Sequence, residues 1–414
     1  MDKNSRNESE KQAWIVKMQE GLPSTFYEAI EYLMRKGGAI TRERKIISGC
    51  QLLFFGLVLA KEKLTYRELA FLGTRYQCSM SDTAWGKRIR GARRALNMIL
   101  QYMLFIMYPV QRWGKLSWDI TDGTSFRIAG GGNREIRLHV HLGENGQLKE
   151  VVITDQHGAE SLLNFNFQPG EIVTADRAYG KKKQLTHLLK EGTPFLVRFS
   201  PRMITWKDER GDKLDIYALL KENTAPFERA ARLEINGPLV RLLFFPIPQE
   251  QWQAIEKRRQ QKIVKNQSKT PDKRTLLTSH WTLLATTLPQ DYDAAQILHL
   301  YRLRWQIETY FKSLKQGLDF HQFRNCSTEL AEAILLLNLI AWLITQYCAN
   351  IQYNLIEDSQ TRRRFSAFPV CKAIAKVFLD WVKANIPLGH SPSTFPLLYL
   401  LDHKRRLLFP SPFP

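Results

Sequence analysis

The chain has 414 residues, and its 44% hydrophobic content excludes a disordered or low-complexity protein. At roughly 150 residues per domain, this length predicts two to four domains. Lys and Arg outnumber Asp and Glu by 60 to 40, and the net charge of +20 favours a polyanionic partner, either nucleic acid or an acidic membrane surface. The five cysteines are scattered without the close spacing of zinc ligands, which is typical of free thiols in a reducing compartment.

The N-terminal twenty residues are polar and mixed in charge, so no signal peptide is expected there. The longest apolar run, 330–347, approaches the length of a membrane span, but it contains Glu332, Asn338 and Gln346. A buried core helix explains this run better, so nucleic acid is the expected partner and the membrane is not.

Helical patterns predominate up to residue 114. Thr65 and Glu68 have the spacing of a capping box and predict a short helix, and after a polar turn Ser81 or Asp82 caps a second one. The second helix is basic, with Lys87, Arg88 and Arg90 among its cations. Two helices joined by a short turn are typical of a helix-turn-helix DNA reader, although any helical hairpin with a solvated basic face has the same pattern. We expect residues 1–114 to form a helical DNA-binding domain.

From residue 116 the pattern changes to short strands. Three strand-like runs come first and then alternate with helices, which predicts an α/β fold with a mixed sheet and helices packed on it. The expected strands are 116–121, 136–142, 151–154, 171–175 and 194–199, and the expected helices are 159–164 and 181–191.

Residues 200–289 interrupt this alternation. Strand-like runs at 240–246 and 281–288 flank a basic stretch, 257–274, that lacks apolar periodicity. Such a stretch is typical of a solvated loop or tether. Trp252 and Trp281 beside it favour a nucleic-acid surface instead.

The most informative segment is a predicted long helix at 293–317. With about 100° of rotation per residue, Glu308 shares one stripe with two aromatic side chains and three cations, namely Tyr301, Trp305, Arg304, Lys312 and Lys315. Exposed ion pairs at i,i+4 spacing would also explain these charges. One carboxylate among cations and stacking aromatics instead favours a metal site that faces a phosphate backbone.

Asp122 and Asp176 each follow a predicted strand. Acidic residues at strand ends most often form turns or helix caps. Together with Glu308, however, they would supply three hard oxygen ligands, which suit Mg²⁺ or Mn²⁺ rather than zinc. A pair of such ions can activate an attacking water and stabilise the leaving oxygen of a phosphodiester. Asp119 competes with Asp122 as the first ligand, although it lies on the opposite face of the strand.

Four motifs in this order resemble those of DDE transposases of the insertion-sequence-four family, which are bacterial cut-and-paste enzymes. Asp122-Gly-Thr-Ser resembles the first aspartate motif of the family, and Asp176-Arg-Ala-Tyr-Gly resembles the second. The signature of the last catalytic helix is matched by Tyr301, Arg304, Glu308 and Lys315. The runs Leu138-His139 and Gly158-Ala-Glu-Ser161 also look familial. The resemblance covers about 116–318.

The resemblance implies an RNase H-like catalytic core at 115–200 and 290–330. It further implies a β-rich insertion at 201–289, and a helical C-terminal region then follows at 331–414. Asp122, Asp176 and Glu308 would be the catalytic metal ligands, holding two Mg²⁺ ions that Mn²⁺ can replace.

The resemblance also implies how such a protein acts on double-stranded DNA. A homodimer would cleave the inverted repeats at the transposon ends through a DNA hairpin and transfer them into target DNA, in the bacterial cytoplasm and in association with the nucleoid. Phosphates would be held by Tyr301, Arg304, Lys312 and Lys315. Trp281 and Trp305 would stack on a flipped base, although a core position explains Trp281 almost as well. A catalytically silent DNA-binding descendant acting as a regulator, and an RNase H-like nuclease without strand transfer, stay open as alternatives.

Overall fold

The structure, a computed structural model, describes residues 26–42, 46, 48–76, 78–107, 117–130, 134–143, 147–158, 160–266, 273–317 and 322–354. Its contacts divide the chain into two compact units. Unit 1 holds the described parts of Met1–Pro109, Phe126–Ile136 and Ser313–Pro414, and unit 2 holds those of Val110–Ser125 and Arg137–Lys312. The domain boundaries expected from the sequence stay predictions.

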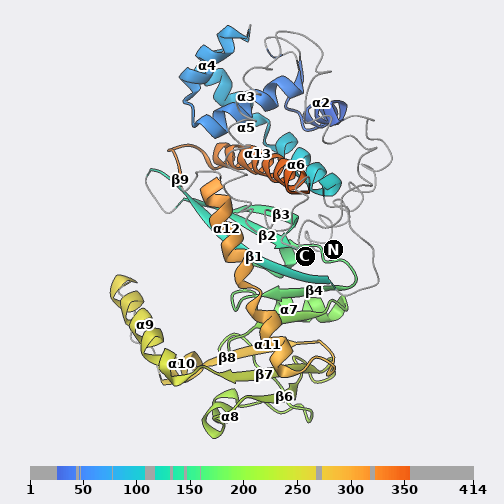
Figure 1. Cartoon of the computed structure of the whole chain (residues 1–414), viewed down its shortest axis with the longest axis vertical. Helices are drawn as coiled ribbons and strands as arrows, with labels where there is room; N and C mark the ends of the chain where they lie inside the picture. The colour runs from blue at the N-terminus through green and yellow to red at the C-terminus, as the bar shows by residue number, and fades with distance from the viewer. Residues whose placement is uncertain are drawn as a thin grey trace. The chain divides into compact units, whose positions relative to one another are not determined.

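Unit 1 is mainly helical (Figure 1). Its helices are α2 (Phe26–Lys36), α3 (Gly49–Glu62), α4 (Tyr66–Arg75), α5 (Asp82–Gly91), α6 (Arg93–Met107) and α13 (Thr328–Asn354). Helix α13 packs against α3 and α6. It is the one described helix that is long and apolar enough to cross a membrane, but 72% of its segment Thr328–Gln346 is buried inside the protein. The prediction of a buried core helix is therefore confirmed, while residues 355–414 of the expected C-terminal region lie outside the described residues.

The two helices expected around residue 80 form as the capping residues dictate. The Thr65 side chain and Glu68 make a complete capping box at the start of α4, and Ser81 caps α5 by accepting a hydrogen bond from the Ala84 amide. Trp85 on α5 is fully buried, and the centre of its ring lies 4.8 Å from that of Phe55. The helix pair is thus anchored to the core of unit 1, with its polar side left at the surface.

Unit 2 is built on a mixed sheet with the strand order β3-β2-β1-β4-β5-β8-β7-β6. Strands β1, β4 and β5 are parallel, whereas β5, β8, β7 and β6 pair antiparallel. The strands are β1 (Ser117–Ile128), β2 (Glu135–Leu142), β3 (Leu148–Asp155), β4 (Glu171–Ala175), β5 (Phe195–Arg198), β6 (Phe227–Ala231), β7 (Val240–Pro246) and β8 (Trp281–Thr286). The last residues of β1 belong to unit 1, where they pair with β9 (Gln322–Phe323).

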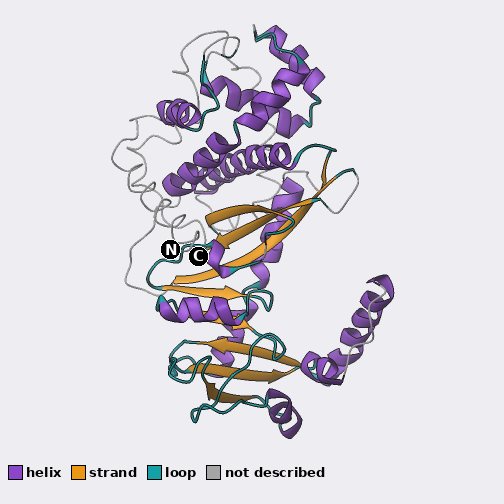
Figure 2. Cartoon of the chain, turned by 180° about the vertical axis from the view of Figure 1, so that it is seen from behind, coloured by secondary structure: helices purple, strands orange, loops and turns teal. Residues whose placement is uncertain are grey.

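Helices cover both faces of this sheet. Figures 1 and 2 show α11 (Ala294–Arg302) on one face and α7 (Lys182–Lys190) on the other. A large apolar cluster fills the space beside β4, β5, β7 and β8, with Trp206, Phe199 and Phe244 fully buried in it. The mixed sheet flanked by helices confirms the predicted α/β class and is consistent with an RNase H-like fold.

One sequence expectation about the segment 201–289 is corrected. The basic stretch is not a loop: α9 (Trp252–Asn266) extends through it and α10 (Lys273–Ser279) follows, with 267–272 outside the described residues. Lys, Arg and Gln are good helix formers, so this segment is helical without an apolar stripe. The same segment also contains α8 (Ile216–Glu222) and the strands β6, β7 and β8, which extend the main sheet.

Three further corrections concern the segments that carry the motifs. The long helix predicted at 293–317 is broken at Leu303 and Arg304 into α11 and α12 (Trp305–Gly317). Strand β1 continues through Asp122 to Ile128 instead of ending at Thr121. The helix expected at 159–164 is only a 3₁₀ turn, η1 (Leu162–Asn164), with Ala159 outside the described residues.

Candidate active site

The ladder between β1 and β4 brings the two aspartates together. These strands are parallel, and their last paired residues are Thr121 and Ala175. Asp122 and Asp176 are therefore the next residues on neighbouring strands that run in the same direction. Although β1 continues beyond Asp122, the two carboxylates still leave the sheet at the point where β4 ends.

Asp122 lies in a largely buried position, with its side chain 20% exposed. One carboxylate oxygen, Oδ1, accepts a hydrogen bond from the Gly123 amide at 2.8 Å, and Oδ2 accepts one from the Arg304 guanidinium at 3.3 Å. Burial raises the pKa of Asp122 to about 6, and the charges of Asp176 and Glu160 add to this effect. The hydrogen bond from the Gly123 amide and the charge of Arg304 reduce this rise in pKa but do not cancel it.

The pKa of Asp176 is shifted in the opposite direction from that of Asp122. Burial again favours its neutral form, but the Arg177 amide, the charges of Arg304 and Arg198 and the Tyr301 hydroxyl together lower its pKa below the ordinary value. The Tyr301 hydroxyl donates to Asp176 Oδ1 at 3.2 Å. Asp176 is thus held in its charged form.

Glu308 joins this group through Arg304. The guanidinium of Arg304 donates one hydrogen bond to Asp122 and another, of 3.1 Å, from Nη2 to Glu308 Oε1. The Glu308 side chain is 57% exposed, so it forms the solvent side of the site. The break between α11 and α12 places Arg304 directly before the second helix, four residues before Glu308. Of the expected cluster, the structure brings together Asp122, Asp176, Tyr301, Arg304 and Glu308.

The other side chains expected on α12 have different surroundings. Lys312 is exposed, and Trp305 is 58% exposed, so its indole ring is accessible. In unit 1, the Lys315 ammonium lies 5.2 Å from the centre of the Phe126 ring, and burial lowers the pKa of this lysine. Of these side chains, Lys312 and Trp305 are exposed and therefore accessible to a ligand.

Trp281 is placed in the core, which is the alternative that its sequence left open. It is 5% exposed and packs edge-on against Phe227, with ring centres 5.7 Å apart. Its indole ring is therefore covered by protein, and it lies among the apolar residues of the sheet.

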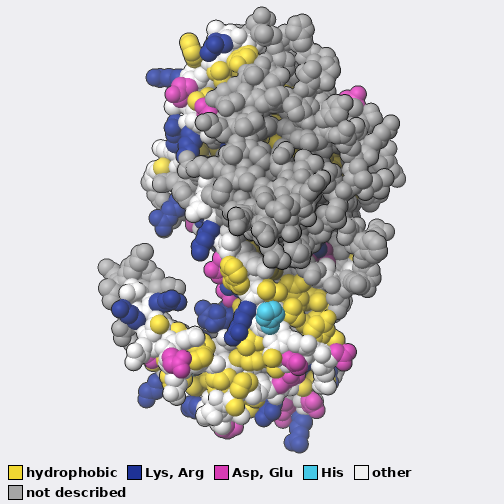
Figure 3. Space-filling view, in the orientation of Figure 1, with side chains coloured by type: hydrophobic (Ala, Val, Ile, Leu, Met, Phe, Trp, Pro, Cys, Tyr) yellow, Lys and Arg dark blue, Asp and Glu magenta, His cyan; other side chains and the backbone are white. Residues whose placement is uncertain are grey.

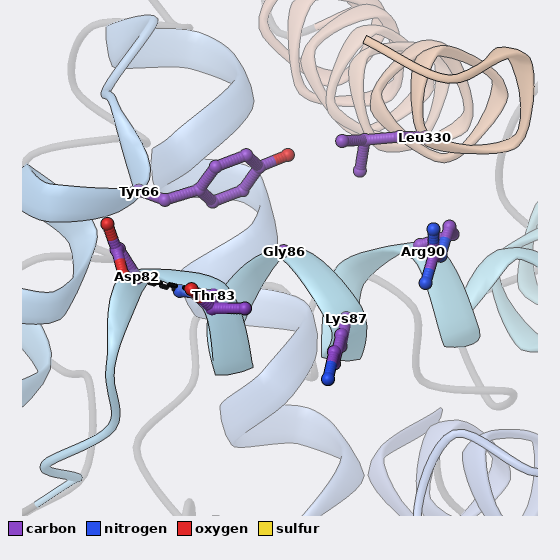
Figure 4. A pocket seen from close by; sticks show the side chains of 7 residues that line it. All are labelled: Tyr66, Asp82, Thr83, Gly86, Lys87, Arg90 and Leu330. Carbon is purple, nitrogen blue, oxygen red and sulfur yellow. Dashed lines mark hydrogen bonds between the residues drawn. The ribbon is translucent and has the colours of Figure 1, made fainter.

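The cationic side chains of helix α5 have two kinds of surroundings: one makes a contact within the protein, and two are exposed. Arg88 donates to the Ala39 carbonyl at 3.2 Å and so ties α5 to the chain after α2. Lys87 and Arg90 are exposed and line a shallow pocket between α4, α5 and α13, together with Tyr66 and Leu330 (Figure 4). Of the three cations expected to contact DNA, the structure leaves Lys87 and Arg90 open to a partner.

Asp119 belongs to a second polar cluster, on the opposite face of β1. It is fully buried and contacts His141 Nε2 at 2.7 Å and the Lys149 ammonium at 2.7 Å, while Lys149 also reaches Glu171 at 2.8 Å. Asp119, His141 and Glu171 form the one group among the described residues with three closely spaced potential metal ligands. Lys149 already supplies a cation to this group, so we interpret it as a charge-compensated network that joins β1, β2, β3 and β4. Asp119 is thereby a weaker candidate for the first ligand than Asp122.

Sequence reasoning missed several polar residues around these clusters. His139 and His141 lie two apart on β2 and therefore on one face of the strand, a signal that alternation could have supplied. The sequence marks Glu160 only as part of the run Gly158-Ala-Glu-Ser161. Arg198 lies at the end of β5 and was given no role, yet its charge acts on Asp176 and Tyr301.

Comparison with known proteins shows what this chain is similar to. Residues 120–344 match the family described as "Transposase DDE domain". The chain is similar to the putative transposase InsL for insertion sequence element IS186A of Escherichia coli (strain K12), with 30% identity over 329 residues, which are 76% of this chain and 88% of the relative. It is also similar to the transposase for insertion sequence element IS421 of Escherichia coli, with 30% identity over 330 residues and the same two shares.

Proposed function

Since the chain belongs to the DDE transposases, enzymes that cleave and transfer DNA with the help of divalent metal, we propose that Asp122, Asp176 and Glu308 are its catalytic carboxylates. The observation that carries this assignment is the arrangement of the three. Two of them leave neighbouring parallel strands side by side, and the third is joined to Asp122 through Arg304.

These residues fit a divalent cation. All three donors are carboxylates, the hard oxygen ligands that Mg²⁺ and Mn²⁺ prefer. A guanidinium already bridges Asp122 and Glu308, so the site attracts positive charge. We propose two Mg²⁺ ions, replaceable by Mn²⁺, which when bound would polarise the phosphodiester and lower the pKa of the attacking water.

The chain's own residues orient the reactants. Tyr301 fixes the Asp176 carboxylate by donating to it, and Asp176 is kept charged. We propose that Arg304, Lys312 and Lys315 hold phosphates around the scissile bond, because cationic contacts to the backbone position DNA without reading its sequence. The exposed Trp305 is suited to stack on a base. We assign no base-stacking role to the buried Trp281.

We further propose the finer features of the insertion-sequence-four family, namely cleavage of the transposon ends through a hairpin, transfer into target DNA and a homodimeric complex. The α4–α5 pair would contact double-stranded DNA through Lys87 and Arg90, which Figure 4 shows beside the pocket. Figure 3 shows further Lys and Arg side chains on α9 and beside α11 in unit 2. The proposed location is the cytoplasm, with the protein on the nucleoid.

A cleavage assay tests the assignment. Wild-type protein is incubated with Mg²⁺ and DNA carrying the inverted repeats that flank the gene, beside Glu308→Gln and the control Glu234→Gln, which changes an exposed carboxylate of unit 2. We expect hairpin or double-strand products from the wild type and the control, and DNA binding without products from Glu308→Gln. Cleavage by Glu308→Gln would contradict the site. Binding without products from the wild type, in Mg²⁺ and in Mn²⁺, would favour a silent descendant, and nicking without joined ends would favour a nuclease.

A further inference from the structure

Arg241 on β7 binds three carbonyl groups of the turn between β8 and α11. Its Nη1 atom donates to the carbonyls of Leu288, Pro289 and Tyr292, at 3.2, 2.6 and 3.1 Å. Its other two nitrogens, Nε and Nη2, donate to the Glu228 carboxylate at 2.7 and 2.9 Å. All the nitrogens of the guanidinium are therefore paired, and one of them holds the turn.

This contact needs an arginine. The Arg241 side chain is 15% exposed, so its charge is stable there only because a bidentate carboxylate and carbonyl oxygens surround it. The planar guanidinium directs two of its nitrogens to Glu228 and leaves the third for the turn, whereas the compact ammonium of a lysine cannot span both partners. Arg241 is also the one charged residue of β7, whose other members are apolar. A charge within such a strand indicates a specific polar contact.

The turn that Arg241 holds leads directly into α11. It ends at Asp293, whose carboxylate accepts a hydrogen bond from the Gln296 amide at 2.7 Å and so caps the helix. Ile297, one turn further on, is fully buried, and Tyr301 lies in the last turn. Arg241 thus fixes the N-terminal end of α11, while the C-terminal end carries residues of the site.

The hydrogen bonds at the C-terminal end of α11 depend on the position of the helix along its axis. The Tyr301 hydroxyl lies 3.2 Å from Asp176 Oδ1, and the guanidinium of Arg304, just after the helix, lies 3.3 Å from Asp122 Oδ2. Both distances already exceed the usual range for their kind of hydrogen bond, so neither tolerates a further increase. Since a helix rises about 1.5 Å per residue, a shift of α11 by one residue would break both contacts.

We propose that Arg241 is a positioning residue of the cleavage reaction. By holding the turn before α11, it sets the position at which Tyr301 and Arg304 meet Asp176 and Asp122. It acts through those residues, which gives β7 a part in the reaction although the aspartates lie on other strands. This inference rests on the proposed function, since it takes the two aspartates as catalytic.

The experiment measures single-turnover cleavage of inverted-repeat DNA by saturating full-length protein with Mg²⁺, at a temperature well below every Tm. Arg241→Gln should lower the cleavage rate constant roughly 10–100-fold at unchanged Kd for DNA, because misplacing a reacting group by about 1 Å can cost this much. Adding Tyr301→Phe should slow cleavage little further, since residues that act through one another have non-additive effects.

Two control variants should cleave as the wild type does. Arg210→Gln removes an exposed arginine of unit 2. Leu220→Ala lowers the Tm by opening a cavity at a buried position of α8, without touching the turn before α11. An equal loss of rate in Leu220→Ala would assign the effect of Arg241→Gln to stability and overturn the inference.

The remaining outcomes separate this inference from the proposed function. Wild-type cleavage by Arg241→Gln, with Glu308→Gln inactive, overturns the role of Arg241 and leaves the catalytic site intact. Effects of Arg241→Gln and Tyr301→Phe that multiply in the double variant overturn it too, whereas cleavage by Glu308→Gln contradicts the site itself. If Arg241→Gln does not fold, Arg241→Lys decides, because it keeps the charge but not the planar guanidinium. A lower rate at unchanged Kd in that folded variant supports the positioning role, and a wild-type rate overturns it.

Discussion

Asp122 and Asp176 are neighbouring carboxylates whose pKa values are moved in opposite directions. Burial dominates at Asp122 and raises its pKa to about 6. At Asp176 the same burial is outweighed by the Arg177 amide, two arginines and the Tyr301 hydroxyl. Environments that push paired carboxylates apart are typical of active sites, where they cost stability until a ligand is bound.

This cost predicts a pH dependence for the metal-free protein. The folded state favours protonated Asp122, so this contribution to stability is complete below pH 4 and is lost as the pH rises through about 6. Asp122→Asn removes the titration. In EDTA the variant should therefore have a higher Tm than the wild type at pH 7, because its free energy of unfolding is greater by up to about 3 kcal/mol. Near pH 4 the two Tm values should match. A thermal melt at both pH values measures this, with the exposed Asp291→Asn as control. A Tm difference independent of pH would contradict the shift at Asp122.

Arg304 donates hydrogen bonds to two of the carboxylates that a metal ion would need. Its guanidinium contacts Asp122 and Glu308, so cation binding must displace it or weaken its hydrogen bonds. Arg304→Gln should therefore bind Mn²⁺ roughly tenfold more tightly without DNA, a gain of about 1.4 kcal/mol, yet cleave DNA more slowly because a phosphate contact is lost. Calorimetry and the cleavage assay measure the two effects. Arg302→Gln, an exposed neighbour on α11, is the control, and weaker Mn²⁺ binding by Arg304→Gln would show that Arg304 supports the ion instead.

At the scale of the element, the strands that carry the site follow from short-range sequence. Strand β4 has the predicted bounds, and β1 begins within one residue of its prediction, because alternation and flanking turns act locally. The break between α11 and α12 was not predictable in this way. Hydrogen bonds from the Gln306 and Ile307 amides to carbonyls three residues earlier tighten the chain there. The hydrogen bond between Arg304 and Asp122 joins residues that are far apart in the sequence. The periodicity of the helix therefore predicted which of its residues belong to the site, but not the contacts that they make.

Alanine substitution of the two tryptophans that the sequence assigns to base stacking should have different effects. Trp281 at the start of β8 is buried against Phe227, whereas Trp305 at the start of α12 is exposed. Trp281→Ala should lower the free energy of unfolding by about 3–5 kcal/mol through the cavity it leaves. Trp305→Ala should change it by less than about 0.5 kcal/mol but slow DNA processing, since a stacked base contributes about 1–3 kcal/mol. Denaturant melts and hairpin assays separate the two, and a destabilised Trp305→Ala would contradict its exposure.

For the whole molecule, the net charge of +20 determines how binding to DNA responds to salt. Each phosphate that the protein neutralises releases counterions, so the logarithm of the binding constant falls with the logarithm of salt by about 0.9 per contact. The charge is spread over many surfaces, and only the cations that touch DNA enter this slope. The slope therefore reports which part of the chain meets the phosphate backbone, independently of cleavage.

Helix α5 can be tested in this way. Lys87 and Arg90 are exposed on it, while Arg88 is tied to the Ala39 carbonyl. A Lys87→Ala and Arg90→Ala double variant should reduce the salt slope by roughly 2, at unchanged Tm, if both side chains contact phosphates. The control pair Lys182→Ala and Lys190→Ala removes the same charge from exposed positions on α7, so a loss common to both variants would reflect net charge alone. Fluorescence anisotropy on inverted-repeat DNA at several salt concentrations measures the slopes. An unchanged slope in the α5 variant alone would assign the end contacts to other cations, among which those of α9 would be tested next.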